Sequence, residues 1–171
     1  MNEIIGNEEL ETPQKRPVFL TVLCVLSFVY IGLSLISGLF SLLTGPASED
    51  AITTMKVLMT TQANEMTDLG VSWAANLMKN MVHIVESTNT QHYLVVLSGI
   101  LISVIGAIGV FWMLKGKKLG FHFYIIYCLM SVVQLYFFVD AKYIPTFLVV
   151  FNIVFSGLWI LLYSRNLKWL K

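Results

Sequence analysis

The feature that most constrains this chain is a pair of long apolar segments separated by a short lysine-rich turn. Residues 93–114 contain 13 Leu, Ile, Val or Phe residues and no charged side chain, and residues 119–139 are again uncharged. At roughly 0.3 to 0.6 kcal/mol per such residue, bilayer insertion of residues 93–114 is favourable by about 4 to 8 kcal/mol. The turn between the two segments holds three lysines and no acid, and short turns of this kind stay in the cytoplasm. The sequence therefore predicts two membrane spans joined on the cytoplasmic side.

Two further segments, 17–44 and 145–163, also lack Asp, Glu, Lys and Arg. The whole chain is 57% hydrophobic and only 12% charged, whereas soluble domains contain about 25% charged residues. Both cysteines lie inside apolar segments, where a thiol behaves as a small hydrophobic group, so we expect no structural disulfide. The predicted fold class is all-α, a four-helix transmembrane bundle.

The first apolar segment has a competing interpretation as a cleaved signal peptide, because Gly45 and Ala47 resemble a small-residue cleavage site. The apolar core of a signal peptide is usually about 7 to 15 residues long. Residues 18–44 form an uncharged run of 27 residues. This length favours an uncleaved membrane anchor.

The segment 45–92 is more polar and is predicted to form two amphipathic helices outside the cytoplasm. Pro46 ends the first span, and Ser48 followed by two acids is a typical helix start. Ile52, Met55 and Met59 then recur at helical spacing. A second such pattern follows after the break near Gly70. Neither helix is expected to span the bilayer, because charged residues interrupt both patterns: Lys56, Glu65, Asp68, Lys79 and Glu86.

These boundaries define the predicted domain organisation. In chain order it comprises a disordered cytoplasmic tail (1–16), the first span (17–44), the helical extracytoplasmic loop (45–92), the second span (93–114), a cytoplasmic turn (115–118), the third span (119–139), an outer turn (140–144), the fourth span (145–163) and a basic cytoplasmic tail (164–171).

Basic residues determine the predicted orientation, because cytoplasmic segments near spans are enriched in Lys and Arg. With the amino terminus inside, eight of the 11 basic residues fall on the cytoplasmic side. These topology determinants are Lys15, Arg16, Lys115, Lys117, Lys118, Arg165, Lys168 and Lys171. Both termini are therefore predicted to be cytoplasmic.

Small and amide side chains within the spans are the candidate helix-packing residues. Ser34 and Gly38 share one face of the first span, and Gly99 and Ser103 share one face of the second. They are predicted to contact another helix, either within the chain or on a partner. Gln134 and Asn152 are amides on the third and fourth spans, for which a packing role is favoured over substrate binding. A hydrogen bond between the two across the hairpin is one such packing contact.

Several kinds of chemistry find no support in the sequence. The spans contain no Asp, Glu, Lys or Arg, which argues against a proton-coupled transporter acting as a monomer; His122 lies near one span end and is expected to form interfacial hydrogen bonds. No catalytic or phosphate-binding motif occurs. We therefore predict no catalytic residues, no cofactor and no nucleic-acid partner. No metal site is assigned, although five methionines and two histidines of the outer loop leave open a soft-metal site for Cu(I).

The opening of the first span, Lys15-Arg16-Pro17-Val18-Phe19-Leu20-Thr21-Val22-Leu23-Cys24, continues as Val25-Leu26-Ser27-Phe28. This segment resembles the opening of a group of small, uncharacterised bacterial four-span inner-membrane proteins. The likeness covers that stretch and the overall layout. It implies a bacterial inner (plasma) membrane and no particular activity.

Together these features predict a non-enzymatic, multi-pass membrane protein. The expected partners are the lipid bilayer and either another membrane protein or further copies of this chain. An accessory or assembly subunit of a membrane complex is the primary hypothesis. An oligomeric small transporter or channel is the first alternative, and an extracytoplasmic copper-binding protein is the second.

Overall fold

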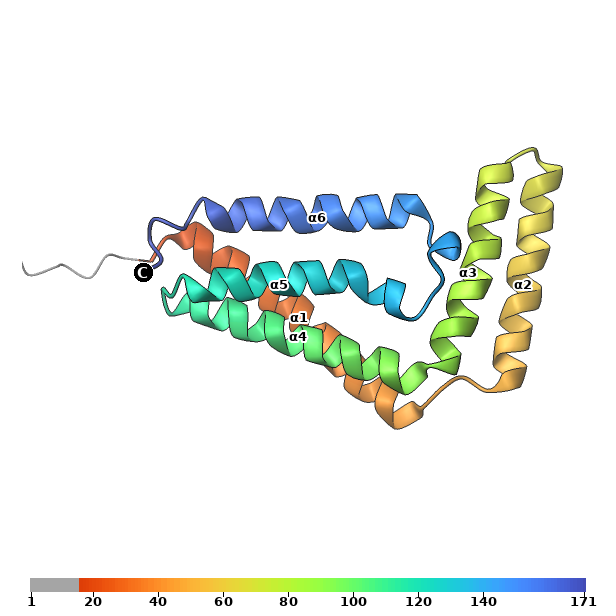
Figure 1. Cartoon of the computed structure of the whole chain (residues 1–171), viewed down its shortest axis with the longest axis horizontal. Coiled ribbons are helices and arrows are strands. Elements are labelled where there is room, and N and C mark those ends of the chain that lie inside the picture. Colours follow the sequence, from red (N-terminus) through yellow and green to blue (C-terminus); the bar gives the residue numbers. More distant parts are fainter. Residues whose placement is uncertain (1–15) are drawn as a thin grey trace, which may run out of the picture.

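The computed structural model describes residues 16–171 and shows a bundle of long helices with a helical hairpin set across one end (Figure 1). The helices are α1 (Val18–Thr44), α2 (Glu49–Asp68), α3 (Ser72–Thr90), α4 (His92–Leu114), α5 (Leu119–Val133) and α6 (Thr146–Ser164), with two short 3₁₀ helices, η1 (Gln134–Phe137) and η2 (Ala141–Tyr143). Four helical stretches are long and apolar enough to cross a membrane: α1, α4, α5 continued by η1, and α6. For residues 16–171 the predicted all-helical fold, with four helical stretches apolar enough to span a membrane, is confirmed.

The two ends of the bundle differ in charge, and only one of them is covered by the α2–α3 hairpin. One end, here called the basic end, holds the start of α1, the turn between α4 and α5, and the residues after α6 (Figure 1). At the other, the hairpin end, α2 and α3 lie across the bundle. Of the predicted disordered tail, only Arg16 belongs to the described residues.

The third span departs from a single regular helix. Residues 119–139 are predicted as one span, but α5 ends at Val133 and the chain tightens into η1 before turning. Such 3₁₀ turns are frequent at helix ends. Pro145, predicted as the first residue of the fourth span, instead precedes α6 as its N-cap in an extended conformation. A proline fits there because an N–H at a helix start has no partner within the helix, so its absence costs nothing.

Helices α4 and α5 make the closest crossing in the bundle, because glycine backbones meet there. A Cβ atom built on Gly120 would lie 2.5 Å from the carbonyl oxygen of Gly109 and 2.5 Å from the amide nitrogen of Met113. Only glycine permits this approach. Tyr127 covers Gly106 in a similar way about two turns further along α5.

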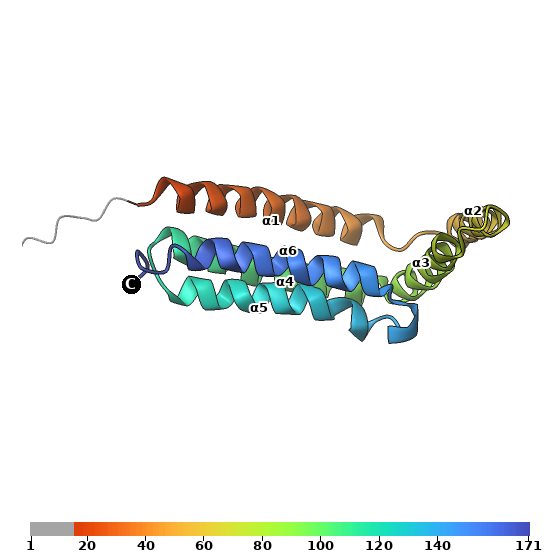
Figure 2. The same ribbon diagram turned by 90° about the horizontal axis from the view of Figure 1, so that it is seen from above.

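The buried core lies toward the basic end rather than along the whole bundle. It is formed by Leu20, Leu23, Cys24, Ile31, Val110, Met113, Phe121, Tyr124, Cys128, Tyr163 and Leu170. Helix α6 contributes only Tyr163 to this core. Helix α6 therefore exposes most of its surface, and Figures 1 and 2 show it running roughly parallel to α5.

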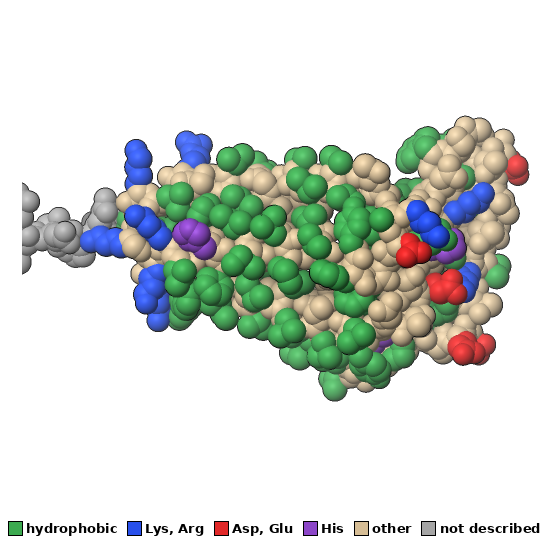
Figure 3. Space-filling model, viewed as in Figure 1, with side chains coloured by type: hydrophobic (Ala, Val, Ile, Leu, Met, Phe, Trp, Pro, Cys, Tyr) green, Lys and Arg blue, Asp and Glu red, His purple; other side chains and the backbone are tan. Residues whose placement is uncertain are grey.

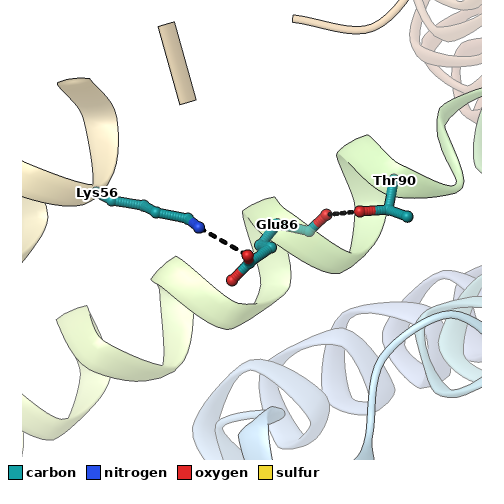
Figure 4. A network of polar contacts seen from close by, with 3 residues as sticks. All are labelled: Lys56, Glu86 and Thr90. Carbon is teal, nitrogen blue, oxygen red and sulfur yellow. Dashed lines mark hydrogen bonds and ion pairs between the residues drawn. The ribbon is translucent and has the colours of Figure 1, made fainter. Parts of the chain in front are cut away.

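The hairpin of α2 and α3 is held by small buried residues and one ion pair. Ser48 caps α2 by accepting a hydrogen bond from the Ala51 amide over 3.3 Å, as its sequence context predicts. Lys56 Nζ lies 2.6 Å from Glu86 Oε1 across the hairpin (Figure 4). Ala63 and Ala75 are buried between the two helices, and their small side chains permit close helix packing.

The hairpin is also connected to the rest of the bundle. The side-chain amide of Asn89 bonds both backbone groups of Ala47, accepting from its N–H over 2.8 Å and donating to its carbonyl over 3.2 Å. The His83 ring stacks on Tyr143 of η2 with 3.9 Å between centroids. These contacts position the hairpin over the ends of the spans.

Candidate interaction groove

A cavity of about 650 Å³ lies between α1, α5 and α6, where the buried core ends. Leu26, Ile31 and Phe155 contribute apolar surface, and Tyr30, Tyr127 and Trp159 contribute aromatic rings. The remaining polar lining consists of hydroxyls and one amide: Ser27, Ser131, Asn152 and Ser156. We call this cavity the interaction groove.

One end of the groove is closed by a buried polar contact. The Tyr163 hydroxyl donates a hydrogen bond to Ser27 Oγ over 2.9 Å, and Tyr163 is completely buried. The Tyr124 ring packs on the Tyr163 ring with centroids 4.7 Å apart. These contacts hold α6 against α1 and α5 at the basic end, and the groove begins beyond them.

Asn152 is a polar residue of the groove whose hydrogen bonding is incomplete among the described residues. Its Oδ1 accepts a hydrogen bond from Ser156 Oγ over 3.3 Å, and its amide N–H groups have no partner among residues 16–171. The residue lies six positions into α6, about 9 Å from the helix start. A polar group at that depth in hydrocarbon is costly unless something binds it.

The expected hydrogen bond between Gln134 and Asn152 is wrong, because Gln134 faces α4 instead. Its Nε2 donates to the carbonyl of Val95 over 3.2 Å and to Ser98 Oγ over 2.9 Å. Gly99 makes room for it, since a Cβ there would lie 3.4 Å from that same nitrogen. Gln134 thus ties η1 to α4 and leaves Asn152 to the groove.

The small residues singled out on the first two spans face one another. Ser34 Oγ lies 3.2 Å from Ser103 Oγ, within hydrogen-bond distance. A Cβ on Gly38 would lie 2.9 Å from Cγ1 of Ile100. Of the two possibilities left open by the sequence, these contacts are made within the chain.

Three methionines of the hairpin line a second, smaller cavity of about 300 Å³. Met59, Met78 and Met81 share it with Phe147 and Leu148 of α6. Met55 and Met66 are not among its lining residues. Within residues 16–171, no three His, Cys, Asp or Glu side chains gather in a way that would hold a metal ion.

The described topology determinants all belong to the basic end. They come from the start of α1, the α4–α5 turn and the segment after α6, and their side chains are exposed. Lys15 lies outside the described residues. His122, also near this end, is exposed, and its Nδ1 lies 3.2 Å from the Lys118 carbonyl oxygen.

Sequence reasoning did not identify most of the groove. Ser27, Ser131 and Ser156 are isolated hydroxyls in apolar helices, and no local pattern marks Tyr163 as a core residue. The available signal was the spacing of Asn152 and Ser156, which places two polar groups one helical turn apart on α6. Which helix Asn152 and Ser156 face depends on how α6 packs against α1 and α5.

Comparison with family models, curated proteins and solved structures finds no match to this chain. Function must therefore be argued from the groove, the cavity of methionines and the distribution of charge.

Proposed function

We propose that this chain is a non-enzymatic membrane protein that acts as an accessory or assembly subunit, with the interaction groove receiving one transmembrane helix of a partner protein. The observation that carries this proposal is the incompletely bonded amide of Asn152 in a groove between α1, α5 and α6. Polar side chains of this kind join helices within membranes. A partner helix with a hydroxyl or amide at the matching height would complete the hydrogen bonding.

The chemistry of the groove favours a helix over a lipid chain. An acyl chain fills apolar space but offers no acceptor for the Asn152 N–H groups, whereas a polar side chain does. Ser131 and Ser156 add hydroxyls near the same surface. Because α6 is held mainly at its basic end, a partner helix can enter beside it without breaking the contact between Tyr163 and Ser27.

The proposed setting is a bacterial inner membrane, with both termini and the 115–118 turn in the cytoplasm. Support comes from the clustering of cations at one end of the apolar helices, opposite the hairpin (Figure 3). The α2–α3 hairpin is then extracytoplasmic. In this arrangement the groove lies within the bilayer and opens sideways to other membrane proteins.

Site-specific photo-crosslinking tests the proposal in cells. Benzoylphenylalanine at position 155 replaces a residue that lines the groove and is 50% exposed, and at position 154 it replaces a residue outside the groove that is 63% exposed. We expect one discrete foreign membrane protein to be crosslinked from Phe155 and not from Val154. An Asn152→Leu substitution should lower that yield about 3- to 18-fold, the loss of one polar contact in lipid.

Other products would count against the proposal. A product at twice the mass of the chain identifies a second copy in the groove and favours the oligomeric transporter or channel. Crosslinks only to lipid from both positions would show that the groove has no protein partner. An Asn152→Leu variant with undiminished crosslinking would exclude the amide as the recognition element.

A further inference from the structure

The basic end gathers cations from three separate segments of the chain. Arg16 precedes α1, three lysines occupy the α4–α5 turn, and one arginine and two lysines follow α6. Their side chains are all exposed, and Figure 3 shows Lys and Arg side chains gathered at this end of the visible face. The described members are Arg16, Lys115, Lys117, Lys118, Arg165, Lys168 and Lys171. We call this set the basic surface.

The segment after α6 is folded back onto the α4–α5 turn. The Lys118 amide donates to the Lys171 carbonyl over 2.9 Å, and the Lys171 amide donates to the Gly116 carbonyl over 2.6 Å. Gly116 has φ +79°, a left-handed conformation that favours glycine. Two reciprocal backbone hydrogen bonds therefore fix the cations of the tail beside those of the turn.

Side-chain packing completes this docking. A Cβ on Gly116 would lie 3.2 Å from the Trp169 ring, so the indole covers that glycine closely. The Arg16 guanidinium lies over the Trp169 ring, 5.9 Å from its centroid, within the range of a cation–π contact. Leu170 is 1% exposed and joins the bundle core. The basic surface is thus a folded part of the molecule.

Acidic side chains of the described chain lie at the opposite end. Residues 16–171 contain Glu49, Asp50, Glu65, Asp68, Glu86 and Asp140, which belong to the hairpin and to the connection between η1 and η2. On the face drawn in Figure 3, the visible acids lie at the hairpin end. Among the described residues, the charged side chains of the basic surface are therefore all positive.

We propose that the basic surface binds the headgroups of anionic phospholipids selectively, with the docked tail forming part of the binding surface. The charge of the basic surface complements that of anionic headgroups at the depth where headgroups lie. The cations stand at the ends of apolar helices, and Trp112 and Trp169 mark the interface between hydrocarbon and water. Lysine and arginine clusters beside spans attract anionic lipids, and each cation contributes about fivefold in affinity.

A lipid headgroup fits this surface better than a soluble phosphate compound. The cations lie next to exposed apolar helix surfaces, which include Phe111 at 47% and Leu119 at 52% exposure. A phospholipid engages both surfaces at once, its phosphate at the cations and its acyl chains along the helices. A soluble phosphate uses only the charges, which salt screens.

Native mass spectrometry of the full-length purified protein tests the proposal. The protein is titrated with phosphatidylglycerol or with phosphatidylcholine of the same acyl composition. We expect preferential binding of phosphatidylglycerol, reduced roughly 25-fold in a Lys118→Gln, Lys168→Gln variant that loses two cations. The control is Lys79→Gln, Lys142→Gln, which removes the same charge from the hairpin end and should leave the preference unchanged.

A second variant tests the docked tail without changing charge. Gly116→Ala places a Cβ against Trp169 and strains the left-handed backbone, so the tail should be displaced and phosphatidylglycerol binding reduced. Helical content and melting temperature of each variant establish that the bundle is folded. Unchanged lipid binding by a folded Gly116→Ala protein whose tail is displaced would refute the role of the docked tail.

Three further outcomes would overturn lipid selectivity. The first is equal binding of the two lipids, and the second is displacement of phosphatidylglycerol by inorganic phosphate at a matching concentration. The third concerns the chain's own acids Glu3, Glu8, Glu9 and Glu11, which precede Arg16. If a preference for phosphatidylglycerol appears only after all four are replaced by Gln, then that segment, and not lipid, occupies the basic surface.

Discussion

Tyr163 and Ser27 join the last span to the first through a hydrogen bond of 2.9 Å that is wholly buried, although 136 positions separate the two residues. This contact marks the boundary between the packed core and the open groove. On its basic side the helices enclose Cys24, Met113 and Tyr124. On its other side a cavity lies between α1, α5 and α6, and Asn152 lines it.

We therefore predict that Tyr163→Phe destabilises the protein by about 0.6 to 1.7 kcal/mol, the measured range for polar contacts between membrane helices. Equilibrium unfolding in mixed detergent micelles measures this change. Ser164→Ala is the matched control, because its hydroxyl bonds the Leu161 carbonyl of its own helix. In a double-mutant cycle with Ser27→Ala, strictly additive effects would contradict the contact.

The glycine crossing of α4 and α5 gives a second prediction. Gly120→Ala should destabilise the bundle by about 1 to 3 kcal/mol, because the added methyl group meets the Gly109 and Met113 backbones, which cannot move aside. Thermal unfolding in detergent reports the loss. Gly157→Ala on α6 has nothing within 4 Å of its new Cβ and should be neutral or slightly stabilising. Equal effects at the two positions would argue against the close crossing.

The ion pair of the hairpin predicts a pH dependence. The hydrogen bond from Lys56 lowers the pKa of Glu86 below its ordinary value of 4.5, with the lysine charge adding to the effect. A lowered folded-state pKa stabilises the hairpin above the unfolded-state pKa, and that contribution disappears as pH falls through the lowered value. We expect an NMR titration of Glu86 to shift upward toward 4.5 in Lys56→Met. An unchanged midpoint would exclude the pair.

The methionine-lined cavity distinguishes packing from metal binding. Met59, Met78 and Met81 meet apolar groups of α6 there. The Met59→Leu, Met78→Leu variant should therefore lose less than about 1.5 kcal/mol of unfolding free energy per substitution. We also expect elemental analysis of the protein purified after growth with copper to give less than stoichiometric metal. Bound Cu(I) that disappears in this double variant, and persists in Met55→Leu, would instead support the copper-binding alternative.

The orientation predicts opposite labelling of two engineered cysteines. Leu69 lies at the tip of the hairpin and is 74% exposed, whereas Lys117 lies in the lysine-rich turn. The two variants are Leu69→Cys and Lys117→Cys. A membrane-impermeant maleimide added to intact cells should label the first and not the second. The native thiols of Cys24 and Cys128 are buried, so the unmodified protein provides the background. Labelling of Lys117→Cys alone would reverse the proposed topology.

The sequence by itself determined the helices of this protein, because the signals are local. Uncharged runs of sufficient length set the four spans, Ser48 with its acids starts α2, and Pro145 stands before α6. Patterns of this kind depend on the solvent around each segment and on backbone chemistry within one helical turn. They also located Ser34 and Ser103 on contact faces.

Only the tertiary structure decided which faces meet. Gln134 and Asn152 have the same functional group and similar depth, yet one bonds α4 while the other lines the groove. The difference arises because glycines draw α5 against α4, while α6 is anchored through Tyr163 and otherwise stands apart. Interhelical distances depend on side chains far apart in the sequence, so periodicity within one segment does not specify them.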